Sequence, residues 1–175
     1  MMRQVGAWLL LAVMLITMAG CGTEADVEVG LLEMEKAAYS RDGMEIQLPE
    51  AFRELNVDGY TVCFEATTAA IFTLKEPFTL AEGVEKLSVR EYADMVYAAN
   101  AVKSPSAVTE EEGLVIMEYT FFVESEGTDF VYLTSMYKAS DAFWMIQFTC
   151  KKENYAEYRP HFVEWAKSVT FVPAA

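Results

Sequence analysis

Cys21 is the residue with the most distinctive chemistry in this sequence of 175 residues, because it directly follows a long uncharged apolar run. The run covers residues 5–19 and comes after a single positive charge at Arg3, and the small residues Ala19 and Gly20 stand directly before Cys21. A thiol at this position is a nucleophile that can be alkylated, and small residues before it allow a peptidase to approach the backbone. The run has about 15 residues, whereas a spanning helix needs about 20. The pattern therefore favours a cleaved segment over an anchor helix.

This opening stretch resembles the signal of bacterial lipoproteins. Their cleavage box is usually Leu, a small residue, Gly or Ala, and then Cys; here it reads Met18, Ala19, Gly20 and Cys21, with Met in place of Leu. The resemblance implies that residues 1–20 form a signal peptide and that Cys21 receives a diacylglycerol group. Two or more acyl chains anchor a protein stably where one would be marginal. We expect a lipid-anchored protein on the extracytoplasmic face of a bacterial cell membrane; an uncleaved anchor helix and an ordinary secretory signal are the alternatives.

The charge balance restricts the classes of partner. Removal of residues 1–20 takes away only Arg3 among the charged residues, which leaves 12 Lys and Arg against 27 Asp and Glu, a net charge of −15. Because the chain is this acidic, it has no basic stripe that could neutralise phosphates, and we expect no nucleic-acid partner. Anionic lipid head groups would also repel it. The membrane contact that we predict is therefore the lipid on Cys21.

The remaining cysteines and the single histidine suggest no catalytic centre. Cys63 and Cys150 could form a disulfide in an exported domain, but their strand patterns do not match, and two buried free thiols are the favoured interpretation. His161 has no second histidine as a partner, so we interpret it as a helix residue without a catalytic or metal-binding role. We predict no cofactor.

The carboxylates are numerous, but no pattern selects a reactive pair. Residues 110–112 form a Glu run that we interpret as a solvated turn. Residues 124–129 place three carboxylates near a glycine, which could hold calcium, but they lack the ligand spacing of an EF-hand loop. Motifs for a nucleophilic serine, a phosphate loop or a zinc protease are absent from the sequence. We therefore predict no catalytic residue and no metal site.

The apolar patterns predict mostly antiparallel strands. Residues 44–49 form a short strand that ends at Pro49, and residues 60–66 and 69–78 form a hairpin. Residues 114–123, 128–139 and 142–150 predict a three-strand meander joined by tight turns. Both faces of these strands are apolar, which indicates a sheet that is covered on both sides.

Two helices are predicted. Ser88 and Glu91 form a capping box at the start of the first one, which should end before Pro105. The second begins between Asn154 and Pro160, where Pro160 suits a first-turn position. Residues 103–113 between the first helix and the meander are predicted to be a polar loop.

The order of these elements, together with the short segments "LPEAF" and "WAKSVTF", resembles that of the PsbP-like family. The resemblance covers roughly residues 40–173. It implies an α+β domain in which an antiparallel sheet of about six strands is covered by helices on both faces, an α/β/α sandwich. The corresponding organisation is a signal peptide at 1–20, an acidic tether at 21–39 and one globular domain at 40–175.

The resemblance also implies binding or assembly work without catalysis. We expect a non-enzymatic lipoprotein that binds a protein partner or supports an envelope complex. The alternative is a carrier or sensor of a small ligand, with a pocket between a helix and the sheet. A hydrolase with a catalytic carboxylate pair is the third and least supported class.

Overall fold

The computed structural model describes residues 30–100 and 108–172. The predicted signal peptide, its box at Met18, Ala19 and Gly20, and the lipidation site Cys21 lie outside these residues. No helix in the described part of the chain combines the length and the apolar character that crossing a bilayer requires.

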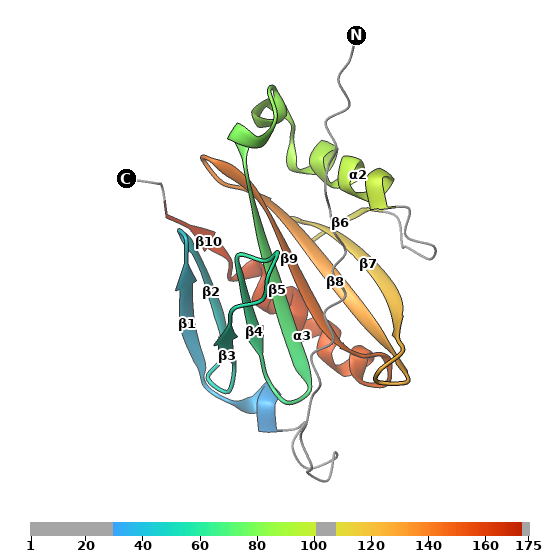
Figure 1. The fold of residues 1–175 in the computed structure, drawn as a ribbon. Coiled ribbons are helices and arrows are strands. Elements are labelled where there is room, and N and C mark those ends of the chain that lie inside the picture. Colours follow the sequence, from blue (N-terminus) through green and yellow to red (C-terminus); the bar gives the residue numbers. More distant parts are fainter. Residues whose placement is uncertain (1–29, 101–107, 173–175) are drawn as a thin grey trace.

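The centre of the molecule is a seven-stranded antiparallel sheet with the order β3–β4–β5–β9–β8–β7–β6 (Figure 1). Its strands are β3 (Arg53–Leu55), β4 (Val62–Glu65), β5 (Ala69–Pro77), β6 (Thr109–Glu111), β7 (Leu114–Val123), β8 (Thr128–Lys138) and β9 (Ala142–Lys151). The hairpin β4–β5 and the meander β7–β8–β9 confirm the sequence prediction. β9 lies in the middle of the sheet and is buried along almost its whole length.

A second sheet of three strands packs beside the first. It consists of β1 (Lys36–Arg41), β2 (Met44–Pro49) and β10 (Thr170–Phe171), in the order β1–β2–β10. Asp42 and Gly43 form the turn between β1 and β2 with φ of 50° and 87°, the positive values that a two-residue hairpin turn requires. β1 occupies residues that we had assigned to the 21–39 tether, so the folded part of the chain begins before residue 40.

The helix α3 (Tyr155–Lys167) covers one face of the large sheet, behind it in Figure 1. Its buried side chains meet the inward side chains of β2, β5, β8 and β9 in the main core. Phe162 shows how tight this contact is, because its ring lies 5.7 Å from that of Phe148 and 5.6 Å from that of Trp165. Pro160 lies inside the helix and not in its first turn, because the chain already turns helical at η3 (Lys152–Asn154).

The helix α2 (Val89–Asn100) lies against the opposite face, at one end of the sheet (Figure 1). It follows the short helices η1 (Phe78–Leu80) and η2 (Val84–Lys86). The predicted capping box is present: the Ser88 amide donates to Glu91 at 2.8 Å, and the Glu91 amide donates to the Ser88 hydroxyl at 3.2 Å. The helix is fixed to the sheet by Tyr92, whose ring stacks on that of Phe143 at 4.1 Å. Both faces of the sheet therefore carry a helix, as predicted.

One predicted loop is a strand. Thr109–Glu111 forms β6 and pairs with β7, and its last residue, Glu111, has a cationic partner. Arg159 on α3 donates to both carboxylate oxygens of Glu111, at 3.0 and 2.7 Å, and to Glu118 at 2.7 Å. The Glu run at 110–112 is thus not simply a solvated turn: Glu111 ties the edge of the sheet to α3.

The two ends of the large sheet are distinct. The described chain enters at the end that carries the turns at 66–69 and 124–127, which we call the entry end (Figure 1). The opposite end carries the turn at 139–141 and the helix α2, and we call it the far end. Because the long antiparallel strands run from one end to the other (Figure 1), a feature at one end is separated from the other end by the length of the sheet.

Candidate functional site

A pocket of about 240 Å³ lies at the far end, on the α3 face of the large sheet, where the small sheet meets β5 and β9. We call it the Trp144 pocket. It is lined by side chains and backbone from the β1–β2 turn, β5, the β8–β9 turn, β9 and the end of β10: Asp42, Gly43, Lys75, Ala139, Asp141, Trp144, Phe171 and Val172.

The floor of the Trp144 pocket is aromatic and its walls are fixed. Trp144 is 1% exposed, and its ring lies 5.6 Å from that of Phe171. The Val172 amide donates to the Gly43 carbonyl at 2.8 Å. A Cβ atom on Gly43 would lie only 3.3 Å from the Val172 carbonyl oxygen, so this wall closes tightly because residue 43 is glycine.

The mouth of the pocket is charged. Lys75 pairs with Trp144 in the β5–β9 register, so its side chain lies along the indole, with Nζ 5.7 Å from the ring centroid. Nζ also lies 2.8 Å from the Asp141 carboxylate and 3.5 Å from the Asp42 carbonyl oxygen. The lining contains two acidic residues, Asp42 and Asp141, and one lysine, so it carries a net negative charge.

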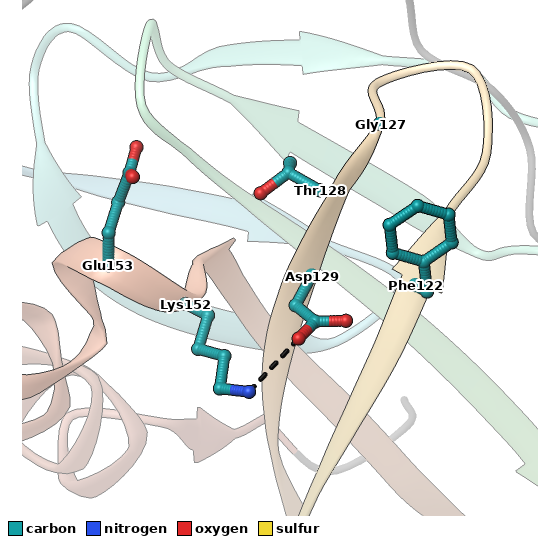
Figure 2. A pocket seen from close by; sticks show the side chains of 6 residues that line it. All are labelled: Phe122, Gly127, Thr128, Asp129, Lys152 and Glu153. Atoms are coloured by element: carbon teal, nitrogen blue, oxygen red, sulfur yellow. Dashed lines mark hydrogen bonds and ion pairs between the residues drawn. The ribbon is translucent and has the colours of Figure 1, made fainter.

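A second, shallow depression of about 440 Å³ lies at the entry end (Figure 2). Its lining is mostly polar, and its aromatic member, Phe122, is 53% exposed. Lys152 and Asp129 form an ion pair across it at 3.0 Å, and Glu153 points away from that pair (Figure 2). Asp129 belongs to the acidic stretch that we considered for calcium, but its carboxylate already binds a lysine.

The structure separates the remaining sequence candidates. Cys63 and Cys150 are free, buried thiols, and they face opposite sides of the sheet, in different apolar clusters. Burial raises the pKa of the Cys63 thiol to about 12, so it is a structural residue and not a nucleophile. His161 lies on α3, 4.0 Å from the Glu164 carboxylate.

The carboxylates of the described residues show no acid–base arrangement. Those whose pKa is shifted, Glu91 and Glu111, are both shifted down: Glu91 by hydrogen bonds from Ser88, and Glu111 by hydrogen bonds from Arg159. A general acid at neutral pH needs the opposite shift. Within residues 30–100 and 108–172, no group of three or more His, Cys, Asp or Glu side chains is placed to hold a metal ion.

The space between α3 and the sheet is filled by large side chains, not by a ligand pocket. Tyr158, Phe162 and Trp165 are each at most 1% exposed, and their rings contact one another. On the α3 side, the place where the carrier hypothesis could put a pocket is therefore occupied by the protein's own core. Both pockets described above lie at the ends of the sheet instead.

Sequence reasoning missed the Trp144 pocket because its lining comes from five segments that are far apart in the chain. The turn at Asp42 and Gly43 was recognisable, but its contact with residue 172 depends on the pairing of β10 with β2. No local pattern predicts that pairing.

Comparisons with known proteins show the fold. No protein-family model matches the sequence, and a search of curated proteins found no match. The chain is similar to the solution structure of cyanobacterial PsbP (CyanoP) from Synechocystis sp. PCC 6803, with a TM-score of 0.52 and 13% identity over 88% of this chain and 99% of that one.

Two further solved structures have comparable scores. The Ran-binding protein Mog1p of Saccharomyces cerevisiae has a TM-score of 0.50 and 8% identity, over 80% of this chain and 97% of that one. A crystal structure from Bacteroides thetaiotaomicron VPI-5482 has a TM-score of 0.51 and 12% identity, over 79% of this chain and 48% of that one. The described domain therefore has the α+β fold of PsbP-like and Mog1-like proteins.

Proposed function

We propose that this protein is a lipid-anchored, extracytoplasmic bacterial lipoprotein that works by binding a protein partner and not by catalysis. Its anchor is the acylated Cys21, and its working part is the domain described above.

The observation that carries this proposal is the position of Cys21 between a signal-like segment and a folded domain. The apolar run ends in the box residues Ala19 and Gly20, and eight residues, 22–29, separate Cys21 from the first described residue. Lipidation of Cys21 explains both the small residues before it and the short polar link after it.

Binding without catalysis is supported by the chemistry of the described domain. Its shifted carboxyl pKa values are lowered, and its thiols at positions 63 and 150 are buried. One protein with a similar fold, Mog1p, is named as a Ran-binding protein. Since a fold does not determine function, that name supports the class of activity and not the identity of a partner.

The anchor is tested by expressing the full chain and its Cys21→Ala variant in a bacterium and separating the membranes from the soluble fraction. We expect the parent protein in the membrane fraction, with a mass that matches a chain starting at Cys21 plus acyl groups. The variant should lose the added mass. Thr23→Ala is the matched control, because it changes the link but keeps the thiol. A parent protein with the unmodified mass of the full chain would refute the proposal.

A further inference from the structure

We propose that the Trp144 pocket is the partner-binding site, and that it takes one bulky apolar side chain from a peptide segment that carries a positive charge next to that side chain. This inference rests on the proposed function, since it names the site and the chemistry through which the domain would bind its partner.

The size of the pocket selects a side chain over a free ligand. Small-molecule sites usually have volumes of about 300–1,000 Å³ and bury most of the ligand. The Trp144 pocket has about 240 Å³ and opens to solvent at the end of the sheet. A pocket of this kind, with an aromatic floor, matches the pockets that receive anchor residues at the centre of protein interfaces.

The charged residues at the mouth of the pocket determine which charge the bound peptide should carry. The ammonium of Lys75 has three N–H donors, and the described contacts direct it to Asp141 and to the Asp42 carbonyl. A donor is left for a carbonyl oxygen of a bound peptide. The carboxylate of Asp141 is 43% exposed, and Asp42 is a second acidic residue of the lining, so the lining favours a cationic group over an anionic one. The net charge of −15 for the chain from Cys21 onward attracts basic partners in the same way.

The position of the pocket relative to the anchor leaves it accessible. Eight residues of tether span at most about 29 Å when fully extended, and the described chain begins at the entry end (Figure 1). β8, with 11 residues, extends over about 37 Å between the entry end and the far end. A domain that stands on its entry end therefore presents the Trp144 pocket away from the bilayer.

The test uses the full-length protein in lipid nanodiscs, with nitrogen-15 in the tryptophan indoles, and three probe peptides. These are acetyl-Leu-Arg-amide, acetyl-Leu-Glu-amide, in which the charge is reversed, and acetyl-Ala-Arg-amide, in which the side chain is small. We expect acetyl-Leu-Arg-amide to shift the indole signal of Trp144 saturably. The signal of Trp165, which lies on α3 and is not among the residues that line the pocket, should not move, and the other two peptides should bind more weakly.

Two variants test the pocket itself. Ala139→Leu fills it and should raise the Kd of acetyl-Leu-Arg-amide by about tenfold or more, whereas Ala156→Leu, the same change on the exposed start of α3 at the entry end, should leave it unchanged. Asp141→Lys removes the ion pair with Lys75 but replaces a side chain that is 43% exposed, so the protein should fold even if Ala139→Leu does not. This substitution should raise the Kd of acetyl-Leu-Arg-amide by about two- to fivefold, as expected for the loss of a surface ion pair, and it should lower the Kd of acetyl-Leu-Glu-amide.

Three results would overturn the assignment: no saturable shift of Trp144, equal binding of the Arg and Glu peptides, or unchanged binding to a folded Ala139→Leu protein. The proposed lipid anchor is tested separately, by measuring the mass of the protein in the same sample. An unlipidated mass with a peptide-dependent shift would refute the proposed anchor and retain the pocket, and a lipidated mass without a shift would do the reverse.

Discussion

Replacement of Tyr92 by Phe should weaken the attachment of α2 to the sheet by an amount that the structure lets us estimate. The Tyr92 hydroxyl donates to the Glu76 carboxylate at 2.7 Å, and the ring is completely buried. A hydrogen bond to a charged group contributes about 1.5–3 kcal/mol. Glu76 is partly exposed and can regain water, so we expect a loss near the lower limit, about 1.5 kcal/mol.

The ring stack supplies a second, separable contribution. The ring of Phe143 lies 4.1 Å from that of Tyr92 with an angle of 3° between them, and such pairs contribute about 0.5–1.5 kcal/mol beyond the area they bury. Tyr92→Phe retains the stack, whereas Tyr92→Leu removes both the stack and the hydrogen bond. The second variant should therefore be the less stable of the two.

The assay is urea unfolding of Tyr92→Phe, Glu76→Gln and the double variant. For a domain of this size, 1.5 kcal/mol corresponds to a fall in Tm of about 3–6 °C, which thermal unfolding can confirm. The coupling energy from the double-mutant cycle should be at least about 0.5 kcal/mol. A coupling energy near zero, or a Tyr92→Phe variant as stable as the parent, would refute the reasoning that this hydrogen bond holds α2 in place.

Three further outcomes are expected. Stability should fall as the pH rises from about 10 towards 12. An unfolded tyrosine loses its proton near pH 10, whereas in the folded protein burial, and to a smaller extent the nearby Cys63 and Tyr132, raises the pKa of Tyr60 to about 12. A urea midpoint that stays constant across this range would contradict the expectation. Cys63 and Cys150 should react with a thiol reagent only after denaturation, because both are buried; rapid labelling of the native protein would contradict it. Phe162→Ala should lower the free energy of unfolding by about 3–5 kcal/mol. The control Phe122→Ala, at a side chain that is 53% exposed, should change it by no more than about 0.5 kcal/mol. Equal effects of the two substitutions would show that the core is misassigned.

Local patterns predicted the elements whose stability is mainly local. The capping box of Ser88 and Glu91 fixed the start of α2, because both hydrogen bonds join residues three positions apart. The meander was predictable because its turns are short and its strands are apolar on both faces. The position of Pro160 was predicted less well, because the preceding η3 turn lets α3 begin upstream of the proline.

Elements that depend on distant partners were not predicted. β6 was assigned to a loop because a run of glutamates does not indicate a strand, and the interaction that stabilises it comes from Arg159, far along the chain. The Trp144 pocket was missed for the same physical reason. Its wall requires the end of β10 to lie against Gly43, and a pairing across so many residues leaves no periodic signal.

The two outer strands of the large sheet have a consequence for the behaviour of the protein at high density. A bare strand at the rim of a sheet is a template for a second chain, and proteins that avoid fibril formation keep such strands short and charged. Here both rims end in three-residue strands, β3 and β6. They carry Arg53 and Glu54 on one side and Glu110 and Glu111 on the other. Copies that crowd together would therefore meet charge and only three residues of strand at β3 and at β6. β6 covers Leu114–Ile116 of the ten-residue β7, so this protection against edge-to-edge pairing is confined to that part of the rim.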